Sequence, residues 1–400
     1  MLSSILNSNL INRSYDISFS YRNSKLYQNQ FQEKMLKKNI PVYPLLIPEW
    51  QYFSKFMKFN PRLISNMFRI LLTPIFFIPA AIYEIILLFF LFKKINPKIL
   101  HINNGGYPGA FSCRMAVIAG KIAKVPKIFM VVNNLIVDYK YFYRRLQYPI
   151  DRIVINSVDC FITGSKAARR RLQKVFKLPN NTFQNIPNGF KFIKRNFNEY
   201  SLKNILKKKK SYEFYIGMLA VLEARKGHGV LIEAIENIFK SNLHFSNHKI
   251  IKVFFAGDGD YKDYLVNLVK KKNLEKNIIF LGQISDIEYF LKKMNIIVQP
   301  SLSYEDFPNA IIESMAFNKP IIGSNVAGIP EIIIDGVTGY IVEPGNSFQL
   351  KNRIIKFIKD PIKVKKMGNA GKKRFKNKYN LNRVLVQYKQ FYNSLVKINS

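Results

Sequence analysis

Residues 296–316 have the sequence IIVQPSLSYEDFPNAIIESMA. The apolar run at 296–299 predicts a buried strand, and the following segment predicts a helix with Pro308 in its first turn and Asp306 as its cap. Backbone N–H groups at the start of a helix have no partner inside the helix, so they attract an anion such as phosphate. This stretch therefore predicts one strand–loop–helix unit of an α/β fold, with a ligand site in the loop.

The same alternation continues through the second half of the chain. Near-continuous apolar runs separated by helix-length segments indicate parallel βαβ units, because the strands of such sheets are buried on both faces. Ligands bind beside the carboxyl ends of these strands. Besides residues 296–299, we expect strands at Phe214–Leu219, Ile250–Ala256, Ile278–Leu281, Pro320–Gly323 and Gly339–Val342.

The first half of the chain has shorter β-branched runs, most of them followed by helix-length segments. These runs also favour parallel βαβ units. We expect strands at Tyr15–Ser20, Ile40–Ile47, Ile99–Asn103, Ile128–Val132 and Phe161–Thr163.

A chain of 400 residues exceeds what one hydrophobic core usually organises. A turn at Asn188-Gly189 and the lysine-rich segment 191–211 interrupt the periodicity, as an interdomain linker does. The expected fold class is therefore α/β, with two tandem Rossmann-like, doubly wound domains that face each other across a cleft. We place the domains at residues 1–205 and 206–378, and expect the C-terminal helix at 379–400 to pack back on the first domain.

The chain is strongly basic, with 63 Lys and Arg against 25 Asp and Glu and a net charge of +38. This charge attracts polyanions, including anionic membranes and phosphorylated small molecules, although a lysine-rich genomic composition also explains it. The basic runs at 169–171 and 207–210 are not interleaved with aromatic residues, so we do not expect a nucleic-acid partner. A hydrophobic content of 48% argues against disorder.

Residues 70–92 form the one stretch long and apolar enough to be considered as a membrane span. Pro74, Pro79 and Glu84 argue against a span, because a lone carboxylate at mid-bilayer is costly. We expect a buried or interfacial helix instead. The two cysteines and the absence of a secretory signal at 1–13 fit a reducing, cytoplasmic setting.

Two glutamates flank the predicted helix start at Pro308. Glu305 and Glu313 are eight positions apart, which is too far for two carboxyls that share a proton. Each can contact a different part of one extended, polyhydroxylated ligand. Taken alone, two acids at this spacing are more often solvated helix residues.

Several short motifs around these glutamates resemble the retaining glycosyltransferases exemplified by sucrose synthases and bacterial mannosyltransferases, a family with the two-domain GT-B fold. The resemblance covers about residues 214–350. Its motifs are Phe280-Leu281-Gly282-Gln283-Ile284-Ser285-Asp286, Val298 to Ser301, Glu305, Glu313-Ser314-Met315-Ala316, Lys319-Pro320, Gly323 to Glu331 and Asp335-Gly336-Val337-Thr338-Gly339.

The resemblance implies a role for each matching position. Glu305 is expected to contact the donor sugar and Glu313 the nucleotide ribose, while Gly282 and Ile284 belong to the loop that lines the base. Phe307, Asn309 and Ala310 fall where the family presents donors to the sugar and diphosphate. Near the domain start, the resemblance assigns Gly217, Arg225 and Lys226 to the diphosphate clamp.

Two positions depart from the family pattern. Met218 stands where we place the family's clamp arginine, so that half of the clamp is missing or supplied by Arg225. A lysine such as Lys226 contributes a point charge without bidentate geometry. In the first domain, Asn134 stands where many members carry a histidine beside the reaction centre, and an amide can donate a hydrogen bond but cannot carry the positive charge. Asn134 and Glu305 are therefore the expected catalytic residues.

The single-residue signals outside these motifs favour structural roles. We expect His101 to be a packing histidine at a strand end and His228 to be a surface histidine. Asp258-Gly259-Asp260 predicts a turn rather than a metal site, because no clustered carboxylates accompany it.

The function implied by the resemblance is transfer of a sugar from a nucleoside-diphosphate-sugar donor to a hydroxyl acceptor with retention, in surface polysaccharide or glycolipid synthesis. It implies no metal and no cofactor beyond the donor. Expected partners are a glycan or lipid-linked acceptor and an anionic membrane, which places the protein at the inner face of the membrane. The alternatives are a non-catalytic donor-binding or membrane-bound scaffold protein, and a sugar-nucleotide epimerase or phosphorylase on the same architecture.

The start of the chain also differs from the family. Members open with a buried strand and a glycine-rich loop that approaches the donor phosphates, whereas the first glycine here is Gly105 and residues 1–14 look like the tail of a helix. We expect the first domain to lack its first strand, as the product of a truncated or mis-started reading frame with impaired activity.

Overall fold

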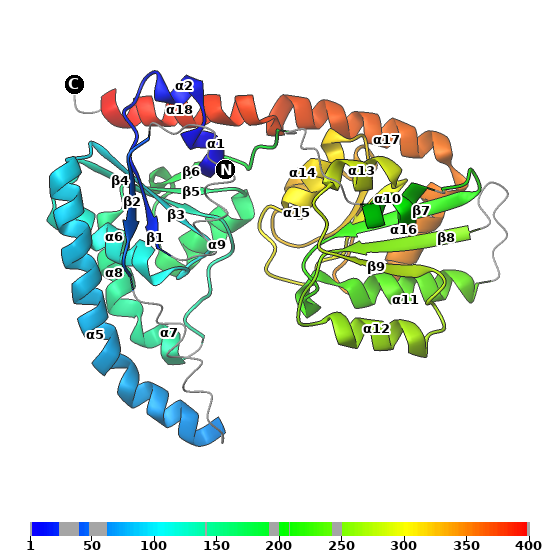
Figure 1. Ribbon diagram of the computed structural model, residues 1–400, viewed down its shortest axis with the longest axis horizontal. Coiled ribbons are helices and arrows are strands. Elements are labelled where there is room, and N and C mark those ends of the chain that lie inside the picture. The colour runs from blue at the N-terminus through cyan, green and yellow to red at the C-terminus, as the bar shows by residue number, and fades with distance from the viewer. Residues whose placement is uncertain are drawn as a thin grey trace. The chain divides into compact units, whose positions relative to one another are not determined.

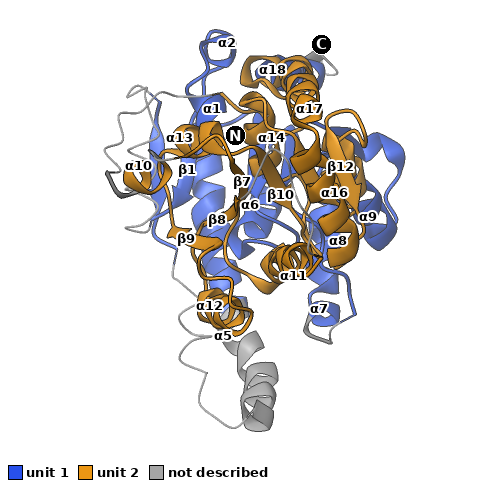
Figure 2. Cartoon of the chain, turned by 90° about the vertical axis from the view of Figure 1, so that its right-hand side faces the viewer, with its two compact units in different colours: residues 1–163, 169–186, 385–400 blue, residues 164–168, 187–384 orange. Residues whose placement is uncertain are grey.

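The computed structural model describes residues 2–23, 40–47, 62–140, 142–191, 200–207, 209–241 and 250–397. The chain divides into two compact units (Figure 2). Unit 1 contains Met1–Thr163, Arg169–Ile186 and Leu385–Ser400, and unit 2 contains Gly164–Ala168 and Pro187–Val384. The chain thus enters unit 2 at residue 187, before the boundary expected at 205, and 164–168 group with unit 2 rather than with their sequence neighbours.

Unit 2 is built on a six-stranded sheet in which every pairing is parallel, in the order β12-β11-β10-β7-β8-β9. Among these strands, Figure 1 labels β7, β8 and β9. The predicted α/β class with parallel strands is confirmed here, nearly to the residue. The strands are β7 (Glu213–Leu219), β8 (Ile250–Ala256), β9 (Ile278–Gly282), β10 (Ile296–Gln299), β11 (Ile321–Ser324) and β12 (Gly339–Val342).

Helices cover both faces of this sheet. They are α10 (Tyr200–Lys207), α11 (His228–Phe239), α12 (Lys262–Lys271), α13 (Ile287–Lys293), α14 (Asn309–Ala316), α15 (Ile329–Ile332), α16 (Ser347–Lys359) and α17 (Pro361–Arg374), with short turns η2 (Ala224–Lys226) and η3 (Phe375–Tyr379).

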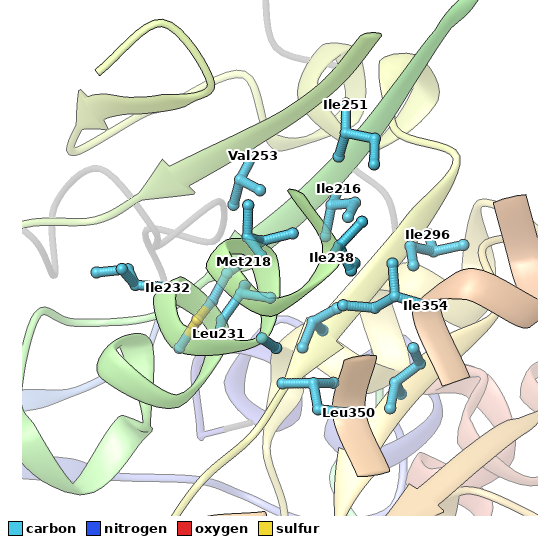
Figure 3. Close-up of a cluster of buried hydrophobic side chains, with 14 of the residues drawn as sticks. Ile216, Met218, Leu231, Ile232, Ile238, Ile251, Val253, Ile296, Leu350 and Ile354 are labelled. Carbon is cyan, nitrogen blue, oxygen red and sulfur yellow. The ribbon is translucent and has the colours of Figure 1, made fainter. Parts of the chain in front are cut away.

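The two faces have separate cores because successive strand residues point to opposite sides. On β7, Phe214, Ile216 and Met218 join the cluster formed with α11 and α16, part of which is drawn in Figure 3. Tyr215 joins the opposite cluster with α13 and α14. A sheet covered on both faces explains why its strands are near-continuous apolar runs.

The strand order reverses between β7 and β10. From β7 the chain moves outward through β8 and β9, then returns to place β10 on the other side of β7. Such a reversal leaves a crevice at the carboxyl ends of the two central strands, and this is the expected ligand position in an open α/β sheet.

The segment predicted as a linker is partly a structural element. Helix α10 lies within residues 191–211, and Leu202 and Leu206 are buried in the core of unit 2. The sequence did not show this helix, because it is short and lies within a polar, lysine-rich segment.

Unit 1 is built on a four-stranded parallel sheet in the order β3-β4-β5-β6. Three of these strands were predicted, while β6 is three residues long and was missed. The strands are β3 (Ile99–Asn104), β4 (Lys127–Val132), β5 (Cys160–Thr163) and β6 (Phe183–Asn185), and the helices include α6 (Phe111–Ile122), α7 (Phe142–Leu146), α8 (Tyr148–Ser157) and α9 (Lys166–Phe176), with turn η1 (Asn180–Thr182).

The last helix, α18 (Leu381–Lys397), contributes its residues from Leu385 onward to unit 1. His101 Nδ1 lies 3.0 Å from the Tyr392 hydroxyl, and the His101 ring packs against Phe129 and Tyr388. Burial lowers the pKa of His101 to about 3, so this histidine is a neutral packing residue, as predicted.

The N-terminal residues form helices α1 (Leu2–Leu6) and α2 (Asn9–Asn12), followed by strands β1 (Phe19–Arg22) and β2 (Val42–Leu45). The strand predicted at 15–20 thus begins four residues later, at Phe19. Within the described residues, β1 and β2 pair in parallel with each other and form a sheet separate from β3–β6.

The apolar stretch at 70–92 lies in helix α5 (Arg62–Ile95). Its described side chains divide into a buried face, which includes Leu88 and Phe92, and an exposed face. The helix is thus buried along one face, while its interfacial role remains a prediction. Among the described helices, none is both long and apolar enough to cross a membrane.

Candidate donor site of unit 2

Two loops meet at the carboxyl ends of β7 and β10. The Leu302 N–H donates to the Arg225 carbonyl at 2.7 Å, which ties loop 300–308 to loop 220–227. Gly227 makes this close approach possible, because it has a φ of +79° and a side chain there would collide with the Pro300 carbonyl oxygen. The sheet topology and the loop packing therefore place residues 225–227 beside residues 300–305.

Glu305 is the centre of the charged contacts in these loops. Its carboxylate forms an ion pair with Lys226, and a guanidinium nitrogen of Arg225 lies 3.6 Å from the same oxygen. The Ser301 hydroxyl donates to this oxygen at 3.3 Å. All three described contacts reach Oε2, and none of the described side chains contacts Oε1. Two predicted clamp cations and the predicted catalytic glutamate thus lie together.

A cavity of about 260 Å³ opens beside these loops and gathers several predicted nucleotide-binding residues. Glu313 and Ala310 of α14 line it together with Ile284 from the loop after β9. Gln283 of the predicted base-lining loop and Leu219 at the end of β7 also line it. The sequence did not indicate the remaining lining residues, namely Ala220, Val221, Ala256 and Gly257. Gly282 precedes this wall with a φ of +68° and turns the chain at the strand end.

Glu313 is the ionisable side chain of this cavity. Burial raises its pKa to about 7, because a low-dielectric surrounding disfavours the charged form. A carboxyl with this pKa can accept hydrogen bonds from two neighbouring hydroxyls once it ionises. This chemistry agrees with the ribose-binding role predicted for Glu313.

The start of α14 differs in detail from the prediction. Pro308 is the N-cap residue, and none of the described side chains caps the helix. Asn309 is exposed, and its side-chain oxygen accepts from Asn188 Nδ2 at 3.1 Å. The Phe307 ring is buried in the core beside Tyr379, so only the backbone of Phe307 remains available to a ligand.

Asp306 is not the helix cap that we predicted. Its side chain is buried and accepts a hydrogen bond from the Ser165 hydroxyl. Burial, together with the nearby Glu331 and Glu305 carboxylates, raises the pKa of Asp306 to about 6. The Asp306 carboxyl contacts Ser165 because residues 164–168 pack on this loop. Helix-capping preferences depend on local sequence and do not predict such a long-range contact.

Gly217 and Met218 do not line the described cavity. Met218 is fully buried in the core cluster of Figure 3, and a side chain at Gly217 would collide with Met294 and Ile297. Both are therefore packing positions, since the pleat of β7 directs them to the two covered faces of the sheet. The exposed side chain at this strand end is Val221, three residues later.

The structure also tests the predictions for His228 and for the segment Asp258-Gly259-Asp260. His228 is buried against Phe255, and burial lowers its pKa to about 4, so the prediction of a surface histidine was wrong. The Lys262 N–H donates to the Gly259 carbonyl at 3.1 Å, which confirms a turn after β8.

Asn134, the second predicted catalytic residue, belongs to unit 1. Its side-chain oxygen accepts from the Leu135 N–H at 2.9 Å, and its Cβ packs against Gly106. It therefore lies in the loop after β4, next to the loop after β3. Its catalytic role remains a prediction.

The sheet topology and the loop motifs together agree with one known family. Residues 202–374 match the family model Glycosyl transferases group 1. The group 1 match begins in α10 and includes every element that lines the cavity, so it supports a transferase.

Comparison with curated proteins extends the likeness beyond this group 1 segment. The chain is 27% identical to the capsular polysaccharide biosynthesis glycosyltransferase CapM of Staphylococcus aureus, over 77% of this chain and 79% of CapM. Alignments with several other curated relatives span about half or less of those proteins.

Solved structures share the fold over nearly the whole chain. A glycosyltransferase from Rickettsia africae ESF-5 has a TM-score of 0.75 at 18% identity, covering 99% of this chain and 94% of that one. Anabaena Alr3699/HepE in complex with UDP has a TM-score of 0.71 at 16% identity, covering 98% and 95%. At these identities the likeness establishes the fold, which is that of the GT-B glycosyltransferases.

Proposed function

We propose that the protein transfers a sugar from a nucleoside-diphosphate-sugar donor to a hydroxyl acceptor with retention at the anomeric carbon. The observation that carries this proposal is the contact of Lys226 and Arg225 with Glu305 beside the cavity that contains Glu313. In a nucleotide sugar the diphosphate joins the sugar to the ribose. We therefore assign the diphosphate to the two cations, the sugar to Glu305 and the ribose to Glu313. The family match of residues 202–374 supports the same reaction class.

The chemical demand in this reaction is to stabilise the departing diphosphate. Lys226 and the uncapped start of α14 place a positive charge and backbone N–H groups where negative charge grows. Glu305 orients the donor sugar, and Glu313 binds the ribose hydroxyls. No metal ion is part of this proposal.

Uridine diphosphate sugars are the first donors to test, because HepE was solved with UDP and with UDP-glucose. We place the acceptor in surface polysaccharide or glycolipid synthesis, as the similarity to CapM suggests. Product analysis separates this function from its alternatives. An epimerase changes the sugar without an acceptor, and a scaffold protein binds the nucleotide without turnover.

We also propose that unit 1 binds peripherally to an anionic membrane, where lipid-linked acceptors reside. The exposed face of α5 carries four apolar residues at four-residue spacing, and Lys93 and Lys94 are exposed at the end of the helix. An apolar stripe beside exposed lysines matches an anionic lipid surface in both polarity and charge. The four residues are Ile78, Ile82, Ile86 and Phe90.

A nucleotide-sugar screen by thermal unfolding tests the donor part of the proposal. A donor that binds only the folded state raises the unfolding midpoint. We expect a rise with at least one nucleotide sugar and a much smaller rise in Glu313→Gln. If no nucleotide sugar shifts the midpoint, the proposed function is wrong.

A further inference from the structure

One buried side chain of unit 1 contacts both loops that follow the neighbouring strands β3 and β4. Asp151 of α8 is fully buried, and each of its carboxylate oxygens has two partners. Oδ1 accepts from the Tyr107 hydroxyl at 3.1 Å and from Arg114 at 3.2 Å. Oδ2 accepts from the Tyr139 hydroxyl at 2.8 Å and lies 2.9 Å from Arg144.

The two tyrosines come from different loops. Tyr107 belongs to loop 105–110 after β3, and Tyr139 belongs to loop 133–140 after β4. Because β3 and β4 are parallel neighbours, these loops leave the same edge of the sheet. The Val137 N–H also donates to the Tyr107 carbonyl at 2.8 Å, so the loops are joined directly as well as through Asp151.

Arg114 and Arg144 add further contacts to loop 133–140 and to the N-cap of α8. Arg144 donates from Nε to the Val137 carbonyl at 3.3 Å and stacks on the Tyr139 ring at 4.8 Å. Arg114 and Arg144 both donate to the side-chain oxygen of Gln147. The network therefore fixes loop 133–140 at three points: a main-chain carbonyl, an aromatic ring and a hydroxyl.

Core stability alone does not explain such a network. Burying one carboxylate with two guanidiniums is costly, and well-packed apolar residues of similar volume hold a core as well or better. Buried polar groups instead fix one geometry, because each needs its own partner. Here the fixed geometry belongs to the loops at the carboxyl edge, where ligands bind in parallel sheets.

The surface held by the network is suited to a sugar or other polyhydroxylated molecule. Gly106 packs on Asn134 between the two loops, and Asn133 donates from its side chain to the Asn104 carbonyl at 2.8 Å. Amide side chains and exposed main chain at Gly105 can exchange hydrogen bonds with hydroxyl groups. Neither loop presents a large exposed apolar side chain among its described residues.

We propose that Tyr107, Tyr139 and Asp151 are positioning residues that hold the loops 105–110 and 133–140 in the geometry that binds the acceptor. This inference rests on the proposed glycosyltransferase function, and it assigns the acceptor-binding surface of unit 1. The donor cavity of unit 2 does not depend on it.

The experiment compares Tyr107→Phe, Tyr139→Phe and the control Tyr148→Phe with the wild type. Each change removes one hydroxyl. Tyr148 is an exposed tyrosine of α8 whose ring touches Tyr139, and no described contact joins its hydroxyl to Asp151. Amide hydrogen exchange is measured for residues 105–110 and 133–140, and KM is measured separately for acceptor and donor.

We expect faster exchange in these loops for Tyr107→Phe and Tyr139→Phe, and an acceptor KM raised by roughly twofold to tenfold, the range expected for one lost hydrogen bond. Donor KM and the Tyr148→Phe control stay unchanged. Unchanged exchange, or faster exchange with an unchanged acceptor KM, would overturn the proposal. The hydrogen-exchange measurement needs no substrate. A wild type without transfer activity therefore refutes the proposed function alone. In that case the exchange rates still decide whether the network holds the two loops.

Discussion

Lys226 and Glu305 are 79 positions apart in the sequence and form an ion pair in which both side chains are about nine-tenths buried. The pair joins the loops after β7 and β10, the two strands between which the sheet order reverses. Without a ligand, the carboxylate neutralises the lysine. In the proposed function, the donor's diphosphate binds Lys226 and a hydroxyl group of the donor sugar binds Glu305.

Lys226→Ala should weaken donor use without unfolding unit 2. A charge-assisted hydrogen bond contributes about 1.5–3 kcal/mol, so kcat/KM should fall roughly tenfold to a hundredfold. The matched control is Lys272→Ala, which removes a lysine paired with Glu236 outside the described cavity lining. Steady-state kinetics with the cognate donor measure both variants, and equal losses in the two would contradict the assigned role.

Glu305→Gln should abolish most transfer while nucleotide binding persists. The amide keeps the size of the side chain but leaves Lys226 without its partner carboxylate. The control is Glu236→Gln, which removes the carboxylate that pairs with Lys240 and Lys272. Near-normal turnover of Glu305→Gln would remove this residue from the chemistry.

Donor affinity should rise with pH through about 7 because of Glu313. Burial raises the pKa of this carboxyl to about 7, so the side chain is protonated below that pH, whereas ribose hydroxyls donate to the ionised form. Each pH unit below 7 should weaken binding by a factor that approaches about ten. Titration calorimetry from pH 5.5 to 8.5 measures the slope.

Glu313→Gln should flatten this slope, whereas Glu84→Gln should not. Glu84 is a buried carboxyl of unit 1 whose pKa is also raised to about 7 by burial, so it controls for titration elsewhere. The raised pKa of Glu313 also makes the free energy of unfolding depend on pH. Stability from a raised carboxyl pKa is lost as pH rises from about 4.5 through 7, so Glu313→Gln should raise the unfolding midpoint more at pH 8 than at pH 5. A slope that survives in Glu313→Gln excludes this residue as its source.

The α5 surface should bind anionic vesicles at low salt. Ile86→Asp places a charge in the middle of the exposed stripe and should weaken binding to phosphatidylglycerol vesicles by roughly tenfold or more, given the apolar area lost. Ile362→Asp is the control, because Ile362 is exposed in unit 2. Co-sedimentation across a salt series measures both. Binding that ignores salt, or equal effects of the two changes, contradicts the proposed surface.

The strands of unit 2 were predictable because their pattern is strong. Each is an apolar run in a βαβ repeat, and all but the edge strand β9 are mostly buried. Predicted and observed bounds differ by one residue at most. The motif residues at the ends of these strands were predictable for the same reason. Glu313, Ile284 and Ala310 meet in one cavity because they follow the carboxyl ends of strands β9 and β10, which belong to one parallel sheet.

The sequence did not show which face of the sheet a strand residue occupies, or which residues from distant segments contact it. The sequence did not show that Met218, which stands at the family's arginine position, is a core residue, because one step along a strand moves a side chain to the other face of the sheet. The cap role of Asp306 failed because Ser165, 141 positions away, supplies its partner. The sequence did not show the Asp151 network, because its members come from five separate segments with no common motif.

The most direct test of the central claim is acceptor-dependent transfer by the wild type and by Glu305→Gln. Nucleoside diphosphate release is followed with a nucleotide sugar and saccharide or lipid-linked acceptors, and the product is identified by mass spectrometry and its anomeric configuration by NMR. The account predicts that the wild type attaches the sugar with retained configuration, and that Glu305→Gln binds the donor but transfers little. Donor binding by the wild type without any glycosylated product, or transfer by Glu305→Gln at the wild-type rate, would contradict it.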